Sequence, residues 1–170
     1  NEENIEAKIE ELANQKKRPA NAQNNGVIVK GIDNCLVKLS KCCHPVPGDN
    51  IIGYITKGRG VSIHRTDCSN IKELIQEEDR LIDVAWASQE KASYFVDIEI
   101  FANDRNGLLA DIVKEINNTK INLQAVSSRI TKEKIAVTEV KIEVENIEEL
   151  NKVLKALRKI DSVYEVKRKR

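Results

Sequence analysis

The stretch YFVDIEIFANDRNGLLADIVKEINNT, residues 94–119, decides the fold of the second half of this chain. In its first part apolar residues occupy every second position, a pattern that is typical of a half-buried β-strand. After Gly107 the apolar residues recur every three or four positions, which predicts an amphipathic α-helix. The stretch therefore predicts a strand that leads through a polar loop into a helix.

The residues that follow continue this order. The segments 121–131 and 134–144 read as two strands joined by a turn, residues 146–160 as a helix with Asn146 as its N-cap, and residues 162–169 as a last strand. The resulting order is βαββαβ on about 75 residues, which indicates a ferredoxin-like antiparallel sheet with both helices on one face.

Upstream of residue 91 the pattern is different. A short amphipathic helix and a linker are expected in residues 1–26, and residues 27–90 contain short β-rich runs separated by Gly, Pro, Asn and Asp. One helix is expected after Asp67, with Asp67 or Ser69 as N-cap, and one closing strand at residues 80–86. The fold class is therefore α+β: a small cysteine-rich α+β domain followed by the βαββαβ domain of residues 91–170.

Composition narrows the class of protein. The 28 basic and 27 acidic side chains leave a net charge of +1, so no global field attracts nucleic acid or a membrane. No apolar run approaches the ~20 residues that cross a bilayer. The charged N-terminus contains no apolar segment of the kind found in signal peptides, and we expect a cytoplasmic protein.

Three of the four cysteines lie near two histidines, between residues 42 and 68. Zinc takes about four thiolate or imidazole ligands in a tetrahedral shell, and Cys42, Cys43, His64 and Cys68 would supply them. Adjacent cysteines in an extended strand point to opposite faces, so both ligate only if the chain turns there. The spacing leaves alternatives open: cysteines packed as small core residues, or a catalytic Cys/His pair. Cys35 reads as a core residue and His44 as solvent-facing or as a neighbour of the ligands.

Two motifs carry a family resemblance. The segment CCHPVPGDNIIGYITKGRGVSIHRTDC, residues 42–68, resembles the conserved cysteine, or zinc-finger, domain of long RelA/SpoT stringent-response proteins. The segments FANDRNGLLADIVKEI and INLQAVSSRI resemble the ACT domain that follows it in those proteins. The resemblance implies a regulatory fragment without the (p)ppGpp synthetase and hydrolase domains, and therefore without enzymatic activity of its own. It also implies that Cys42, Cys43, His64 and Cys68 hold a structural zinc.

The resemblance further implies partners. In the family this region docks on ribosomal RNA near deacylated tRNA, and Lys57, Arg59 and Arg65 are the cations expected to contact phosphates. Such docking would regulate the distant catalytic half allosterically. A solvated turn with ordinary lysine and arginine side chains is the plainer interpretation.

Related ACT domains bind a small amino acid at the loop before their first helix, often at a dimer interface. By motif position Asp104, Gly107 and Asn122 would contact a branched-chain amino acid, and we expect a homodimer through the ACT domain. Ala102 departs from relatives that carry a polar residue there, and a plain capping loop with Asp104 or Asn106 as N-cap is the alternative. Two other functions stay open: a stand-alone ACT-type amino-acid sensor, and a thiol redox sensor that uses Cys42, Cys43 and Cys68.

Overall fold

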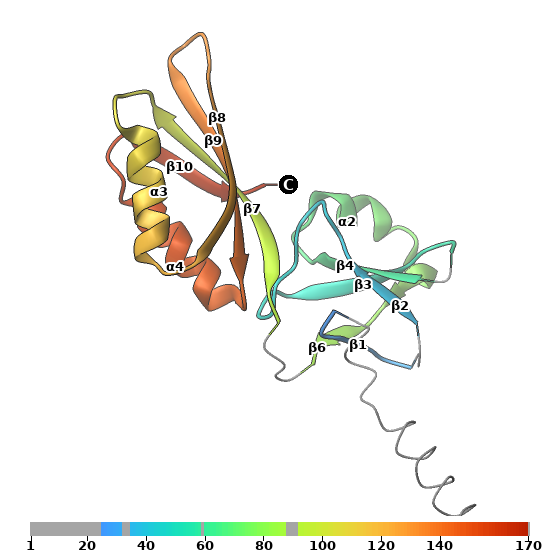
Figure 1. Ribbon diagram of the computed structural model, residues 1–170. Helices are drawn as coiled ribbons and strands as arrows, with labels where there is room; N and C mark the ends of the chain where they lie inside the picture. Colours follow the sequence, from blue (N-terminus) through green and yellow to red (C-terminus); the bar gives the residue numbers. More distant parts are fainter. Residues whose placement is uncertain (1–24, 32–34, 59, 88–91, 170) are drawn as a thin grey trace, which may run out of the picture.

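The computed structural model describes residues 25–31, 35–58, 60–87 and 92–169 and shows two domains side by side (Figure 1). The helix expected near the N-terminus lies outside the described residues. Among the described residues, no helix is both long enough and apolar enough to span a membrane.

The first domain is a small mixed sheet with one short helix. Its elements are β1 (Val27–Val29), β2 (Leu36–Leu39), β3 (Ile51–Ile55), β4 (Gly60–Arg65), α2 (Ser69–Leu74), the 3-10 helix η2 (Glu78–Arg80), β5 (Leu81–Ile82) and β6 (Val84–Trp86). Strands β2, β4, β3 and β5 form one sheet in that order, and β1 pairs with β6 in a separate ribbon. The single closing strand expected at residues 80–86 is therefore divided, because β5 pairs with β3 whereas β6 pairs with β1.

The two faces of the four-stranded sheet have different roles. Alternation along β4 sends Val61 and Ile63 to one face, where they pack with the β1–β6 ribbon in an aliphatic core. Ser62 and His64 point to the other face. A second, smaller core lies there, built from Cys43, Cys68 and Ile71 with Ile52 and Leu74 packed against it.

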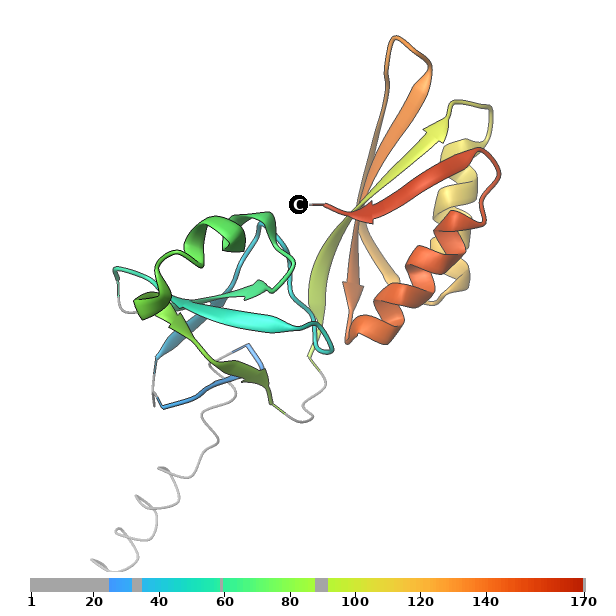
Figure 2. The same ribbon diagram turned by 180° about the vertical axis from the view of Figure 1, so that it is seen from behind.

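The second domain has the predicted βαββαβ order. Its elements are β7 (Tyr94–Asn103), α3 (Leu108–Asn118), β8 (Asn122–Ile130), β9 (Ile135–Val144), α4 (Ile147–Arg158) and β10 (Val163–Arg168). The sheet order is β10-β7-β9-β8 with every neighbouring pair antiparallel, and both helices lie on one face of it (Figure 2). The α+β prediction is confirmed for both domains.

Of the three α-helices among the described residues, one begins at the N-cap residue that the sequence predicted. Asn146 caps α4 as predicted, since its Oδ1 accepts a hydrogen bond from the Glu149 N–H at 2.9 Å. The predicted caps of the other two helices are wrong. Gly107, with a φ of 77°, occupies the N-cap position of α3, and Cys68 occupies that of α2; neither helix has a side-chain cap.

Candidate metal centre

Strand pairing brings the cysteine pair and His64 to the same edge of the sheet. Strands β2 and β4 are parallel, and Leu39 lies opposite Ile63. The carboxyl ends of parallel strands meet at one edge, so the chain that leaves β2 passes beside His64. Cys42 and Cys43 follow within four residues of the end of β2.

A tight turn solves the problem of adjacent cysteines. Residues 41–43 form a turn that is closed by a hydrogen bond from the His44 N–H to the Ser40 carbonyl at 3.0 Å. The backbone is therefore not extended at Cys42 and Cys43, and both sulfurs reach the same site. The turn precedes Pro45 and Pro47, the residues from which a turn was expected.

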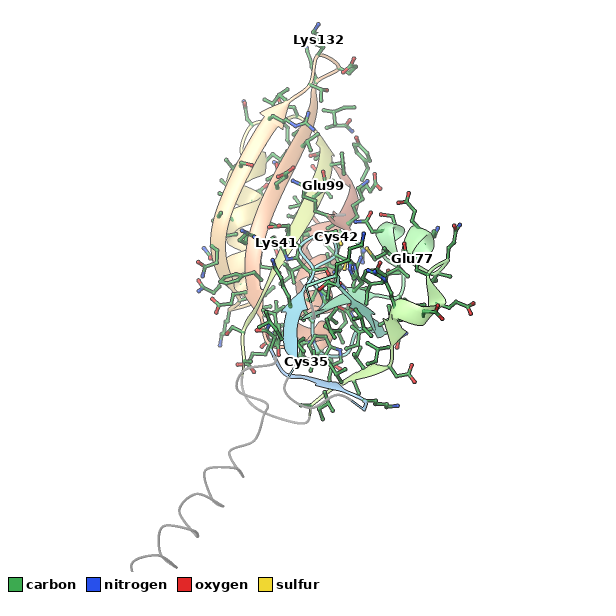
Figure 3. All side chains as sticks on the ribbon, turned by 90° about the vertical axis from the view of Figure 1, so that its right-hand side faces the viewer. Cys35, Lys41, Cys42, Glu77, Glu99 and Lys132 are labelled. Atoms are coloured by element: carbon green, nitrogen blue, oxygen red, sulfur yellow. The ribbon has the colours of Figure 1, made fainter. Side chains whose placement is uncertain are left out.

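Cys68 completes the cluster from the chain that leaves β4. Its N–H donates to the Arg65 carbonyl at 3.0 Å, so the chain reverses directly after the strand. The four atoms, three Sγ and one imidazole nitrogen, all lie within 4.8 Å of one another. Figure 3 shows Cys42 well away from Cys35, which packs against the aliphatic core of the domain as predicted.

The distances within the cluster fit a tetrahedral metal ion. Cys42 Sγ lies 3.9 Å from Cys43 Sγ, 3.6 Å from Cys68 Sγ and 3.3 Å from His64 Nδ1, and Cys43 Sγ lies 3.9 Å from that nitrogen. With Zn–S bonds of about 2.3 Å and Zn–N bonds of about 2.0 Å, a tetrahedron has S–S edges of about 3.8 Å and S–N edges of about 3.5 Å. The donor set and its spacing therefore fit zinc, and all four cysteines are free thiols.

Burial controls the charge of these groups. Desolvation raises the pKa of Cys42 and of Cys43 above the ordinary thiol value, and the neighbouring Cys68 raises both further. The backbone N–H of Arg65, 3.4 Å from Cys43 Sγ, opposes the rise at Cys43. Burial also lowers the pKa of His64. A divalent cation would offset the cost of thiolate charge in this site, and its binding would release protons.

Groups around the cluster orient the imidazole. The Nε2 of His64 lies 3.3 Å from Ser62 Oγ, and the Ser62 hydroxyl donates to the Tyr54 carbonyl at 3.5 Å. If Nδ1 faces the metal, Nε2 carries the proton and donates to Ser62. Metal-bound histidines commonly use such a partner to hold the ring in one tautomer and orientation.

His44 has a different role from the one expected. Its Nε2 lies 3.1 Å from Asp97 Oδ2 in β7 of the second domain, and its side chain is only 21% exposed. Burial lowers the pKa of His44 even though Asp97 acts in the opposite direction. His44 is therefore neither a ligand nor a solvent-facing side chain, and the sequence contained no signal for Asp97 as its partner.

Of the three cations predicted to contact RNA, only Lys57 is described and exposed. Arg59 lies outside the described residues. The Arg65 side chain is 7% exposed, and its Nε lies 3.2 Å from Asp67 Oδ1 without the alignment of a hydrogen bond. The prediction for Arg65 is corrected accordingly, because a buried guanidinium cannot reach a phosphate.

The three residues predicted to bind an amino acid do not meet within one chain. Asp104 follows the end of β7 where Asn103 lies opposite Ile135, and Asn122 lies opposite Glu143 at the other end of β9. Residues 135 and 143 are about 26 Å apart along an extended strand. Gly107 is beside Asp104, whereas the Asn122 amide donates to Glu143 at 3.1 Å. A single-chain site that contains all three residues is excluded.

Comparison with known proteins identifies both domains. The family model described as the RelA/SpoT RIS domain matches residues 27–87, and that of the ACT domain matches residues 90–168. The chain is 45% identical over 149 residues to a GTP pyrophosphokinase of Haemophilus influenzae, a match that covers 86% of this chain and 20% of the relative. It is 38% identical over 156 residues to the bifunctional (p)ppGpp synthase/hydrolase RelA of Mycobacterium tuberculosis. That match covers 92% of this chain and 21% of the relative.

One solved structure aligns with part of the chain. The crystal structure of the ACT domain from GTP pyrophosphokinase of Chlorobium tepidum aligns with 45% of this chain and 99% of its own, at 26% identity and a TM-score of 0.41. The chain spans about a fifth of the length of the curated relatives named above. The RIS match and the ACT match together cover nearly all of residues 27–168, and the chain therefore belongs to the RelA/SpoT family, of which it holds the RIS domain and the ACT domain.

Proposed function

We propose that this chain is a non-catalytic regulatory region of a (p)ppGpp synthetase/hydrolase, in which a structural zinc holds the RIS domain together. Cys42, Cys43, His64 and Cys68 would bind the ion. The observation that carries the proposal is that these four donors lie within 4.8 Å of one another inside a domain of the RelA/SpoT family. The core around the cluster contains few buried side chains, so a metal would add much of its stability.

Metal content tests the zinc proposal directly. Reduced, gently purified protein is analysed for metals, and its thiols are titrated before and after a chelator. We expect about one zinc per chain and three thiols that react only after chelation, because Cys35 lies outside the cluster. Protein without metal, in which every thiol reacts freely, would refute the proposal and favour the thiol redox sensor.

The regulatory role would be exercised through a partner of the whole protein. We propose the ribosome with deacylated tRNA, contacted in part by the exposed turn at Lys57. Occupancy of this partner would shift the balance between two states of the catalytic half. The test is to reverse the charge at Lys57 and to measure ribosome association, which we expect to be weakened.

A second role, amino-acid binding by a dimer, is favoured by the free edge of the ACT sheet. Strand β8 is an edge strand of its sheet, and it leaves Val126 and Ile130 40% and 60% exposed; Leu109 of α3 is 45% exposed. If two β8 strands pair antiparallel, Asn122 of the partner subunit comes to the end of the sheet that carries Asp104 and Gly107. The three predicted residues would then lie at the same end of one sheet shared by two chains.

A further inference from the structure

The segment of residues 44–49 begins directly after two of the proposed metal ligands and lies against the ACT domain. We infer that this segment is a clasp whose hold on the ACT domain depends on metal at the Cys/His cluster. The inference rests on the metal site of the proposed function. It adds a consequence for the ACT domain, which becomes free to reorient when the metal leaves.

Polar contacts close the clasp on two strands of the ACT domain. Arg168 in β10 makes a two-point ion pair with Asp49, with Nη1 2.9 Å from Oδ1 and Nη2 3.0 Å from Oδ2. The same Nη2 donates to the His44 carbonyl at 2.7 Å. The Nε2 of His44 lies 3.1 Å from Asp97 Oδ2 in β7. Bidentate arginine–carboxylate pairs are directional, so these bonds define an orientation as well as a contact.

A tight turn shapes the clasp to the ACT domain. The Asp49 N–H donates to the Val46 carbonyl at 3.0 Å, and Asp49 Oδ2 accepts from the Val46 N–H at 2.8 Å. Pro47 and Gly48, the latter with a φ of 102°, occupy the central positions, as in a type II turn. The Pro47 carbonyl accepts from the Ile147 N–H at the start of α4 at 2.8 Å.

An apolar contact anchors the same turn. Val46 is fully buried, and it belongs to the core of the ACT domain rather than to the cores of its own domain. Trp86 also packs against that core, and its indole N–H donates to the Asp49 carbonyl at 3.1 Å. The clasp therefore combines one side chain, Val46, that is inserted into the core of the ACT domain with several directional hydrogen bonds around it.

The clasp and the cluster share backbone. The hydrogen bond from His44 to Ser40 closes the turn that holds Cys42 and Cys43, and His44 is also the first residue of the clasp. A metal ion that binds both sulfurs would hold this turn in place. Without the ion, only Cys43, Cys68 and Ile71 remain as the fully buried part of that small core. The turn would then loosen, and with it the carbonyl and imidazole that His44 offers to Arg168 and Asp97.

The test measures domain motion and metal affinity in the full chain. Backbone ¹⁵N relaxation gives a rotational correlation time for each domain, with zinc and after chelation. Arg168→Gln and Asp49→Asn open the clasp without touching a ligand. Lys169→Gln is the matched control, because Lys169 pairs with Glu139 within the ACT domain. Metal affinity is measured for each variant by competition with a chromophoric chelator.

We expect a single correlation time for the zinc-bound wild type and two different times after chelation. Arg168→Gln and Asp49→Asn should show two times even with zinc bound, and chelation should add no further separation. Because coupling is reciprocal, both variants should bind zinc at least about fivefold more weakly than Lys169→Gln. Domains that stay together after the metal has left, or clasp variants with wild-type zinc affinity, would overturn the inference and leave the zinc site standing. Wild-type protein that binds no zinc would refute the metal proposal, and the coupling with it.

Discussion

The guanidinium of Arg168, in the last strand of the ACT domain, is paired through two nitrogen atoms with the carboxylate of Asp49, in the loop behind the cysteine pair of the RIS domain. Both side chains are nearly buried, at 11% and 9% exposure. A basic C-terminal segment that could have been read as a solvated tail therefore joins the two domains.

We predict that Arg168→Gln lowers the free energy of unfolding by about 3 kcal/mol, because it leaves the Asp49 carboxylate buried without its partner. Asp49→Asn should cost a similar amount. In the double variant the two losses should fail to add by about 1–3 kcal/mol, as expected for residues in direct contact. Denaturant unfolding of the four proteins measures this coupling; strictly additive losses would contradict it. Lys169→Gln removes an exposed pair and should leave stability close to that of the wild type.

Gly48→Ala should destabilise the protein by about 2 kcal/mol or more. A Cβ at this position would clash with Ile147 Cγ2, and the φ of 102° is unfavourable for alanine. Gly58→Ala is the control, since Gly58 has no atom within 4 Å of the added carbon. Thermal unfolding compares the two, and equal melting temperatures would show that the turn does not press on α4.

Cys68→Ser should lower both the metal content and the melting temperature, because it removes one of four ligands from a site that stabilises a small core. Cys35→Ser should retain the metal, since Cys35 is not part of the cluster. Elemental analysis and calorimetry measure the two effects. Complete loss of metal with unchanged melting would exclude a structural role for the ion.

Lys57→Glu in the full-length protein should weaken association with the ribosome, and the loss relative to wild type should shrink as ionic strength rises, because salt weakens the phosphate contact that the variant lacks. Lys132→Glu is a matched charge reversal at the exposed tip of the β8–β9 turn, far from the RIS domain (Figure 3). Co-sedimentation with ribosomes that carry deacylated tRNA compares them. Equal losses in both variants would point to a general charge effect instead of a contact at Lys57.

A branched-chain amino acid should bind a dimer of the ACT domain and raise its melting temperature. Asn122→Ala should abolish the heat of binding, whereas Asn151→Ala, on the exposed face of α4, should retain it. Isothermal calorimetry with sedimentation analysis gives both affinity and oligomeric state. The absence of heat and of stabilisation at high ligand concentration would leave the loop at Gly107 a purely structural helix start.

The elements of the ACT domain were predicted well because their signals are local. Alternation along β7 and β9 and helical spacing in α3 and α4 follow directly from the geometry of strands and helices. The short elements of the RIS domain were harder to predict from the sequence. The segment at residues 80–86 has one apolar pattern but is divided between two partners, and pairing partners are not encoded in a local pattern.

By itself, the sequence determined the order of the elements, the α+β class, the family resemblance and the residue types able to hold a metal. Only the tertiary structure decided which of these residues meet. The parallel pairing of β2 with β4 brings Cys42 to His64, burial removes Arg65 from the surface, and the length of β9 separates Asp104 from Asn122. The pair of Arg168 with Asp49 depends on the packing of two domains. Such contacts join positions far apart in the chain, and they form only when burial and pairing together outweigh the entropy lost in closing the loops and ordering the chain.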